Sequence, residues 1–199
     1  MANDSFPRGL FPLRLLQATP YKANTAADIF LGMPVALGAD GLVAPANATT
    51  GGGVQFLGAA IGFSDGNKGS IATADPFLDV SDLGSDKEPY VLVADAPQQE
   101  FIVQEDTGGS ALVQADIGLI YTMVYGTGSG NTNTGWTNLE LDRSTGLTGT
   151  AGQIMLLRLH DGVNSDGTVN TTGNYAKYVA KIVHHQKNVG IVANPGPTV

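Results

Sequence analysis

Glycine and proline interrupt this sequence so often that no stretch of it shows the pattern of a long amphipathic helix. The 199 residues include 27 glycines and 10 prolines. No window repeats its apolar residues at helical spacing over the roughly 10–12 residues that a stable helix needs. Short apolar or alternating runs, each ended by turn residues, predict an all-β fold, either a small antiparallel β-barrel or a jelly-roll-like sandwich.

Several of these runs carry the residue types and the alternation of strands. The Asp-Gly pair in Gly38–Gly41 is typical of a hairpin turn, and Asp65–Asn67 is a second expected turn. In residues 175–185, Ala176, Tyr178, Ala180 and Ile182 share one face, and Phe101 and Val103 share a face of another strand. The other expected strands are 29–37, 42–44, 54–63, 90–94, 116–125, 139–142 and 153–160. Residues 126–136 and 161–173 are expected to be loops.

The first 25 residues form a distinct segment. Pro7, Pro12 and Pro20 forbid a continuous helix there, yet the segment is rich in leucine and phenylalanine, which is unusual for a solvated tail. We expect an extended N-terminal arm at 1–25 and a single β-rich body at 26–199. The arm lies either on a partner or, as irregular edge strands, on its own body.

Charge and composition exclude several classes of protein. The net charge is −8, with acidic residues concentrated in the middle of the chain and a small basic excess at each end. An acidic body argues against nucleic-acid binding. No apolar run approaches the roughly 20 residues of a membrane helix, and prolines interrupt what would be a secretory signal. The chain therefore reads as a soluble protein made in the cytosol, with no membrane partner.

Patterns that suggest catalysis or cofactor binding fail on inspection. The glycines of 126–130 precede no helix and no Lys-Ser/Thr pair, so they do not form a phosphate loop. The loop 161–167 lacks the ligand spacing of a calcium site, and His184 and His185 point to opposite faces of a strand. The acidic stretch 75–88 is best explained as a solvated loop. With no cysteine and no nucleophile motif, we expect neither an enzyme nor a cofactor or metal site.

Several segments follow one another in a characteristic order, which begins with a Pro-x-Gly-Leu-x-Pro-x-Arg opening at 7–14 and continues with 32–35, 41–43, 56–63, 90–95, 101–106 and 140–142. This order resembles that of the capsid decoration, or cement, proteins of tailed bacteriophages. The resemblance implies a small, trimeric β protein that binds the outside of an icosahedral head and clamps neighbouring subunits of the major capsid protein. It carries over no catalytic residue.

The N-terminal segment supplies the candidate contact residues. We expect Phe6, Leu10 and Phe11 to anchor each subunit to the capsid or to a sister subunit, with Arg8 and Arg14 as charge partners. The protein would then be found in the virion after synthesis in the host cytoplasm. Deleting residues 1–16 is expected to abolish head binding and to leave the β body folded.

A carbohydrate-binding β module of a tail or fibre is the alternative function. Such modules are also all-β and rich in glycine, and they present exposed aromatic side chains to sugar rings. An exposed aromatic residue near Trp136 or Tyr125 would favour this alternative.

Overall fold

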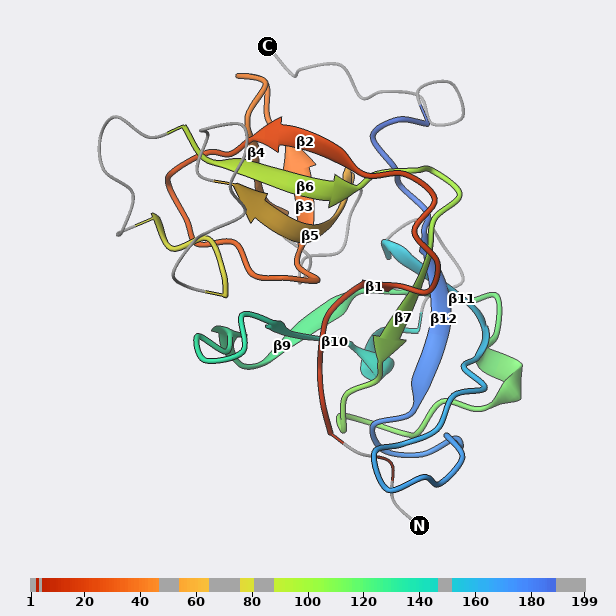
Figure 1. Ribbon diagram of the computed structural model, residues 1–199. Coiled ribbons are helices and arrows are strands. Elements are labelled where there is room, and N and C mark those ends of the chain that lie inside the picture. The colour runs from red at the N-terminus through yellow and green to blue at the C-terminus, as the bar shows by residue number, and fades with distance from the viewer. Residues whose placement is uncertain are drawn as a thin grey trace.

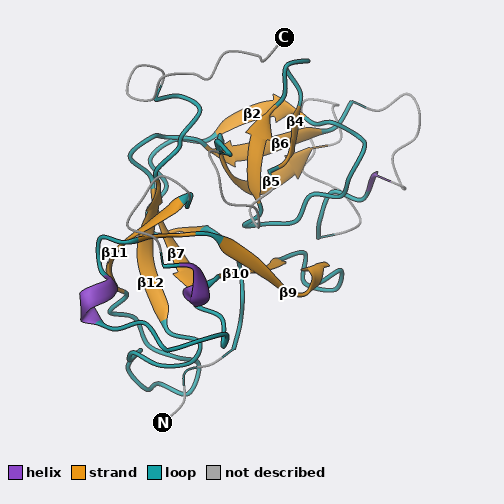
Figure 2. Ribbon diagram, turned by 180° about the vertical axis from the view of Figure 1, so that it is seen from behind, coloured by secondary structure: helices purple, strands orange, loops and turns teal. Residues whose placement is uncertain are grey.

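The structure, a computed structural model, describes residues 3, 5–46, 54–64, 76–80, 88–146 and 152–188. Within these ranges the fold is all-β, as predicted, and the strands form three antiparallel sheets (Figures 1 and 2). Helical structure there is confined to 3-10 turns such as η2 (Gln114–Asp116) and η3 (Arg143–Thr145).

The upper sheet of Figure 1 has the strand order β2-β6-β5-β3-β4. Its strands are β2 (Thr19–Lys22), β3 (Pro34–Leu37), β4 (Val43–Pro45), β5 (Gly58–Ser64) and β6 (Tyr90–Ala94). The predicted hairpin at Gly38–Gly41 is confirmed, since Leu37 pairs with Val43 and the amide of Gly41 donates to the Gly38 carbonyl oxygen at 3.1 Å. The second expected turn, at Asp65–Asn67, lies outside the described residues.

The lower sheet of Figure 1 has the order β1-β7-β12-β11-β8. Its strands are β1 (Phe11–Pro12), β7 (Glu100–Gln104), β8 (Ile120–Tyr121), β11 (Ile154–Leu159) and β12 (Lys177–Ile182). The predicted inward faces are confirmed, because Phe101, Val103, Ala176, Tyr178, Ala180 and Ile182 are all buried.

The third sheet is the hairpin of β9 (Met123–Gly130) and β10 (Thr137–Leu141). The expectation of a loop beginning at residue 126 is wrong, because β9 continues through the glycines to Gly130. Gly130 pairs with Thr137, whose hydroxyl donates to the Ser129 carbonyl oxygen at 2.8 Å. The ring of Phe30 lies so close to Gly130 that a Cβ there would overlap it. Glycine serves close packing at this position.

The N-terminal segment contributes an edge strand to each of the two larger sheets. Phe11 of β1 pairs with Ile102 of β7, and Tyr21 of β2 pairs with Val91 of β6. Figure 1 shows the segment running from one sheet to the other. Of the two arrangements that the sequence left open, this structure has the one in which the segment lies on its own body.

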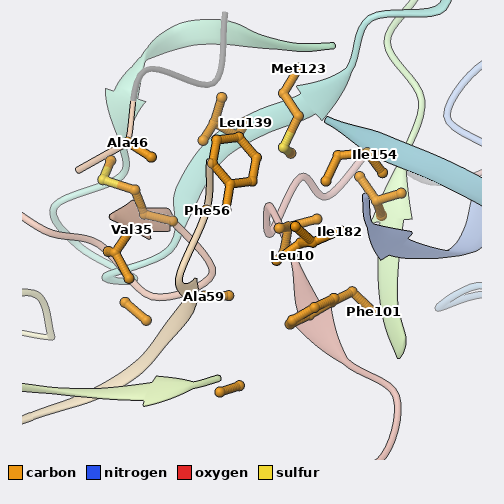
Figure 3. Close-up of a cluster of buried hydrophobic side chains, with 14 of the residues drawn as sticks. Leu10, Val35, Ala46, Phe56, Ala59, Phe101, Met123, Leu139, Ile154 and Ile182 are labelled. Carbon is orange, nitrogen blue, oxygen red and sulfur yellow. The ribbon is translucent and has the colours of Figure 1, made fainter. Parts of the chain in front are cut away.

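One cluster of buried apolar side chains joins both larger sheets, the hairpin and the N-terminal segment. Figure 3 shows Leu10 near Phe101, Ile154 and Ile182, with Phe56 also in the cluster. None of the three sheets closes on itself, so the described chain forms no barrel from a single sheet and agrees with the sandwich alternative.

Leu10 should be critical for stability. We expect Leu10→Ala to lower the free energy of unfolding by about 2–5 kcal/mol, because it removes a fully buried side chain and leaves a cavity. Leu15→Ala is the matched control; Leu15 is 50% exposed, so its loss should change stability by no more than about 0.5 kcal/mol. Urea denaturation of both variants measures the difference, and equal effects would contradict the assignment of Leu10 to the core.

Candidate functional site

The N-terminal segment is held against the body at several points. The buried side chain of Asn3 donates to the carbonyl oxygen of Thr171 at 2.7 Å. The backbone amide of Phe6 donates to Oε1 of Gln104 at 2.9 Å, and the side chain of Leu10 is buried in the core. Because the backbone is fixed at these points, the side chains that face outward are presented from a defined position.

Four of the five predicted contact residues remain accessible. Phe6 is 43% exposed, Arg8 and Arg14 are exposed, and Phe11 is half-buried. Leu10 differs from the expectation, because its side chain has no exposed surface. It anchors the segment to this chain's own core, and the contact surface is corrected to the other four residues.

Arg8 lies among three aromatic rings. Its guanidinium carbon is 4.4 Å from the ring centre of Phe6, 5.3 Å from that of Trp136 and 5.9 Å from that of Phe11. The rings of Phe11 and Trp136 are 5.6 Å apart and tilted by 56°. Cation–π contacts of this kind are worth about 0.5–1 kcal/mol at exposed sites. They hold the Arg8 side chain over the segment.

A groove of about 690 Å³ opens beside this cluster. Phe6, Arg8 and Phe11 line it from the N-terminal segment, Ile102 from β7 and Lys177 from β12. The loop that follows β11 completes the wall. Three of the five residues predicted from the sequence therefore share one concave surface with side chains that the sequence analysis did not connect to them.

Two cations line the groove at neutral pH. They are Arg8 and Lys177, and among the residues that the structure describes no carboxylate lines it. The ammonium of Lys177 makes one long hydrogen bond of 3.4 Å to Oδ1 of Asn164. His160 also lines the groove, but burial lowers the pKa of its imidazole, so the ring is neutral at pH 7. The positive charge thus comes from Arg8 and Lys177, on a chain whose net charge is −8.

Two exposed leucines lie between β1 and β2. Leu15 and Leu16 are 50% and 52% exposed. The buried side chain of Gln99 fixes their backbone, since it accepts from the Leu16 amide at 3.0 Å and donates to the Arg14 carbonyl oxygen at 2.6 Å. These leucines belong to the outward surface of the segment but were not singled out from the sequence.

A second group of ionisable side chains lies buried at the turn that follows β7. Nη1 of Arg143 is 3.6 Å from Oε1 of Glu105, which is fully buried. The guanidinium also donates to the carbonyl oxygens of Thr107, Gly108 and Gly109 at 2.8, 2.7 and 3.0 Å. Neither charged residue lines the groove. The arrangement closes the turn after β7 around Arg143 and is structural.

Burial gives Glu105 a measurable signature. Desolvation raises the pKa of its carboxyl from 4.5 to about 7. Between these values the folded chain holds a proton that the unfolded chain has lost. The contribution of Glu105 to the free energy of unfolding is therefore complete below pH 4.5 and falls as the pH rises towards 7.

Replacing Glu105 should reduce this dependence on pH. As the pH is raised from roughly 5 to 7.5, we expect the free energy of unfolding of Glu105→Gln to rise relative to that of the wild type by about 1–3 kcal/mol. One pKa unit corresponds to about 1.4 kcal/mol. Urea denaturation at several pH values measures this difference. The control is Glu100→Gln, which removes a carboxylate of an exposed ion pair with Arg158 and should change stability by no more than about 1 kcal/mol. Parallel profiles for Glu105→Gln and the wild type would contradict the expectation.

The patterns considered for nucleotide or metal binding have other structural roles. Residues 126–130 lie in β9 and start no helix. In the loop 161–167, the carboxylate of Asp166 accepts from the amide and hydroxyl of Thr168 at 2.9 and 2.6 Å. Nδ1 of His185 accepts from the Lys187 amide at 3.0 Å. Among the described residues no group of three or more His, Asp or Glu is placed to hold a metal ion. Much of the acidic stretch 75–88 lies outside them.

Comparison of the chain with protein-family models, with curated proteins and with solved structures gives no match. Family membership is therefore not assigned, and the likeness to cement proteins stays a resemblance carried by the sequence segments given above. Within the described ranges, no helix has the length and apolar composition needed to cross a lipid bilayer.

Proposed function

We propose that this chain is a structural virion protein that binds the outer surface of an icosahedral phage head and stabilises it by clamping neighbouring subunits of the major capsid protein. It has no catalytic role in this proposal, and it acts as a homotrimer, as the resemblance implies. The observation that carries the proposal is the N-terminal segment, in which exposed aromatic, leucine and arginine side chains project from a backbone fixed to the body.

The composition of this surface supports a protein partner. Aromatic residues and arginine are enriched in protein interfaces, and they dominate the binding free energy where they occur. Phe6, Leu15 and Leu16 are among the large apolar side chains that remain exposed in the described chain. Because the segment is already ordered on its own body, binding does not have to meet the entropic cost of ordering a free arm.

The low charge content supports contacts on several sides. Charged residues make up 14% of the chain, against roughly 25% in typical soluble domains. Charged residues are depleted at the centres of protein interfaces. An exterior of this composition suits a subunit that contacts both the capsid and its sister subunits.

Substitution of the exposed apolar side chains tests the proposal. We expect the triple variant Phe6→Ser, Leu15→Ser, Leu16→Ser to bind phage heads that lack this protein at least about tenfold more weakly than the wild type, because it removes apolar contacts and keeps the anchors. Co-sedimentation of heads with the purified chain measures binding. The control is Val113→Ser, which changes an exposed apolar residue elsewhere on the surface (51% exposed).

Deletion of residues 1–16 does not test head binding cleanly, whereas point substitutions do. That deletion would remove Asn3, Leu10 and β1, which belong to the body's own packing, so a loss of binding could follow from unfolding. If the triple variant is folded by circular dichroism and binds heads as tightly as the wild type, the proposal is wrong.

A carbohydrate-binding role is the second candidate, and one observation favours it. Phe6, an exposed aromatic residue, lies within the same cluster as Trp136, where a sugar platform was expected. This candidate would be supported over capsid decoration if the chain bound immobilised host glycans, lost that binding in Phe6→Ser, and did not bind phage heads.

A further inference from the structure

The groove beside the N-terminal segment contains two cations with unused hydrogen-bonding capacity. Among the described residues, the guanidinium of Arg8 contacts aromatic rings and makes no hydrogen bond or ion pair. The ammonium of Lys177 makes only the long bond to Asn164 there. A guanidinium carries five donors and an ammonium three, so most of these donors are available to a ligand.

The neutral amides of the groove are already engaged. Gln104 accepts from the Phe6 amide at 2.9 Å and donates to Oε1 of Glu140 at 2.7 Å. The Asn164 side chain donates to Oγ1 of Thr168 at 3.1 Å and to Oδ1 of Asn3 at 3.3 Å. A neutral sugar presents hydroxyls that need both donors and acceptors. This groove offers mainly donors with positive charge, which suit a ligand that brings anionic acceptors.

The rest of the molecule limits how much negative charge the ligand can carry. The chain as a whole has a net charge of −8, so a long polyanion such as a nucleic acid would be repelled beyond the groove. Phe6, Phe11, Ile102 and Val163 add apolar surface to the walls of the groove. An extended peptide places alternate side chains on opposite sides, so carboxylates and apolar side chains can each meet a matching surface.

We propose that the groove binds an extended acidic peptide segment of a protein partner, with carboxylates paired to Arg8 and Lys177 and an apolar side chain against Phe6 and Phe11. This inference rests on the proposed function in taking the partner to be a protein. It adds the chemistry of the segment that the partner must present.

Trp136 provides a probe for the test. It is the only tryptophan of the chain, and Arg8 lies 5.3 Å from its ring centre. Titration of the full chain with a synthetic decapeptide of alternating Asp and Leu should change Trp136 emission to saturation. Fluorescence anisotropy of the same peptide labelled with fluorescein measures Kd a second way. This measurement does not depend on Trp136 emission.

The variants separate charge pairing from apolar contact. We expect Arg8→Gln and Lys177→Gln each to weaken binding about tenfold, and added salt to weaken binding to the wild type. Lys22→Gln is the control, because its ammonium pairs with Glu88 at 2.7 Å on the upper sheet and should leave Kd unchanged. A peptide of alternating Asn and Leu should bind at least about tenfold more weakly than the Asp peptide.

Two results would overturn the inference. They are equal binding of the Asn and Asp peptides, and tighter binding of an alginate oligosaccharide than of the Asp peptide. Head binding separates this inference from the proposed function. If the peptide does not bind while the chain still binds heads, the groove inference falls alone. If the peptide binds and heads are not bound, only the head-binding proposal falls.

Discussion

The burial of Leu10 is the contact on which the arrangement of the N-terminal segment depends. Its side chain has no exposed surface, and its amide donates to the Gly32 carbonyl oxygen at 2.8 Å. Here the N-terminal segment crosses the backbone at Gly32 at very short range, because a Cβ on Gly9 would overlap the backbone of Gly32 and a Cβ on Gly32 would overlap the backbone of Arg8. Gly9 and Gly32 also have positive φ angles, of +61° and +75°. Only glycine adopts this backbone readily without a steric clash. Burial of Leu10 and the two glycines together fix the path of the segment.

This path creates the groove. Phe6 lies before the crossing, where its amide donates to Gln104 of β7, and Phe11 follows the crossing as the start of β1. Both residues line the groove together with Arg8. Trp136 meets Arg8 and Phe11 because β10 begins beside the segment. The candidate site is thus a product of tertiary packing, although three of its residues lie within six positions of each other in the sequence.

The alternation of side chains along the sequence predicted those features of the fold that depend on strand geometry alone. The alternation of Tyr178, Ala180 and Ile182 gave the buried face of β12, because strand geometry fixes it whatever the neighbouring strands are. Contacts between distant residues had no such signal. The end of β9 at Gly130 pairs with Thr137 and packs against the ring of Phe30, and the place of Lys177 in the groove depends on β12 lying next to β7. Sequence reasoning found the segment that carries the site but not the wall that faces it.

Several of the carboxylates in this charge-poor chain are buried. Asp95, Glu105 and Glu140 are all buried, so the exterior of a chain with 14% charged residues carries still fewer carboxylates than the composition suggests. Asp95 is neutralised internally, because it accepts from the Tyr21 hydroxyl at 2.7 Å and pairs with Lys187. Repulsion between like-charged surfaces is strong only within a Debye length, about 8 Å at physiological salt. Under the proposed function, copies packed side by side on a head would lie within that distance, and each carboxylate placed in the interior would lower the repulsion between them.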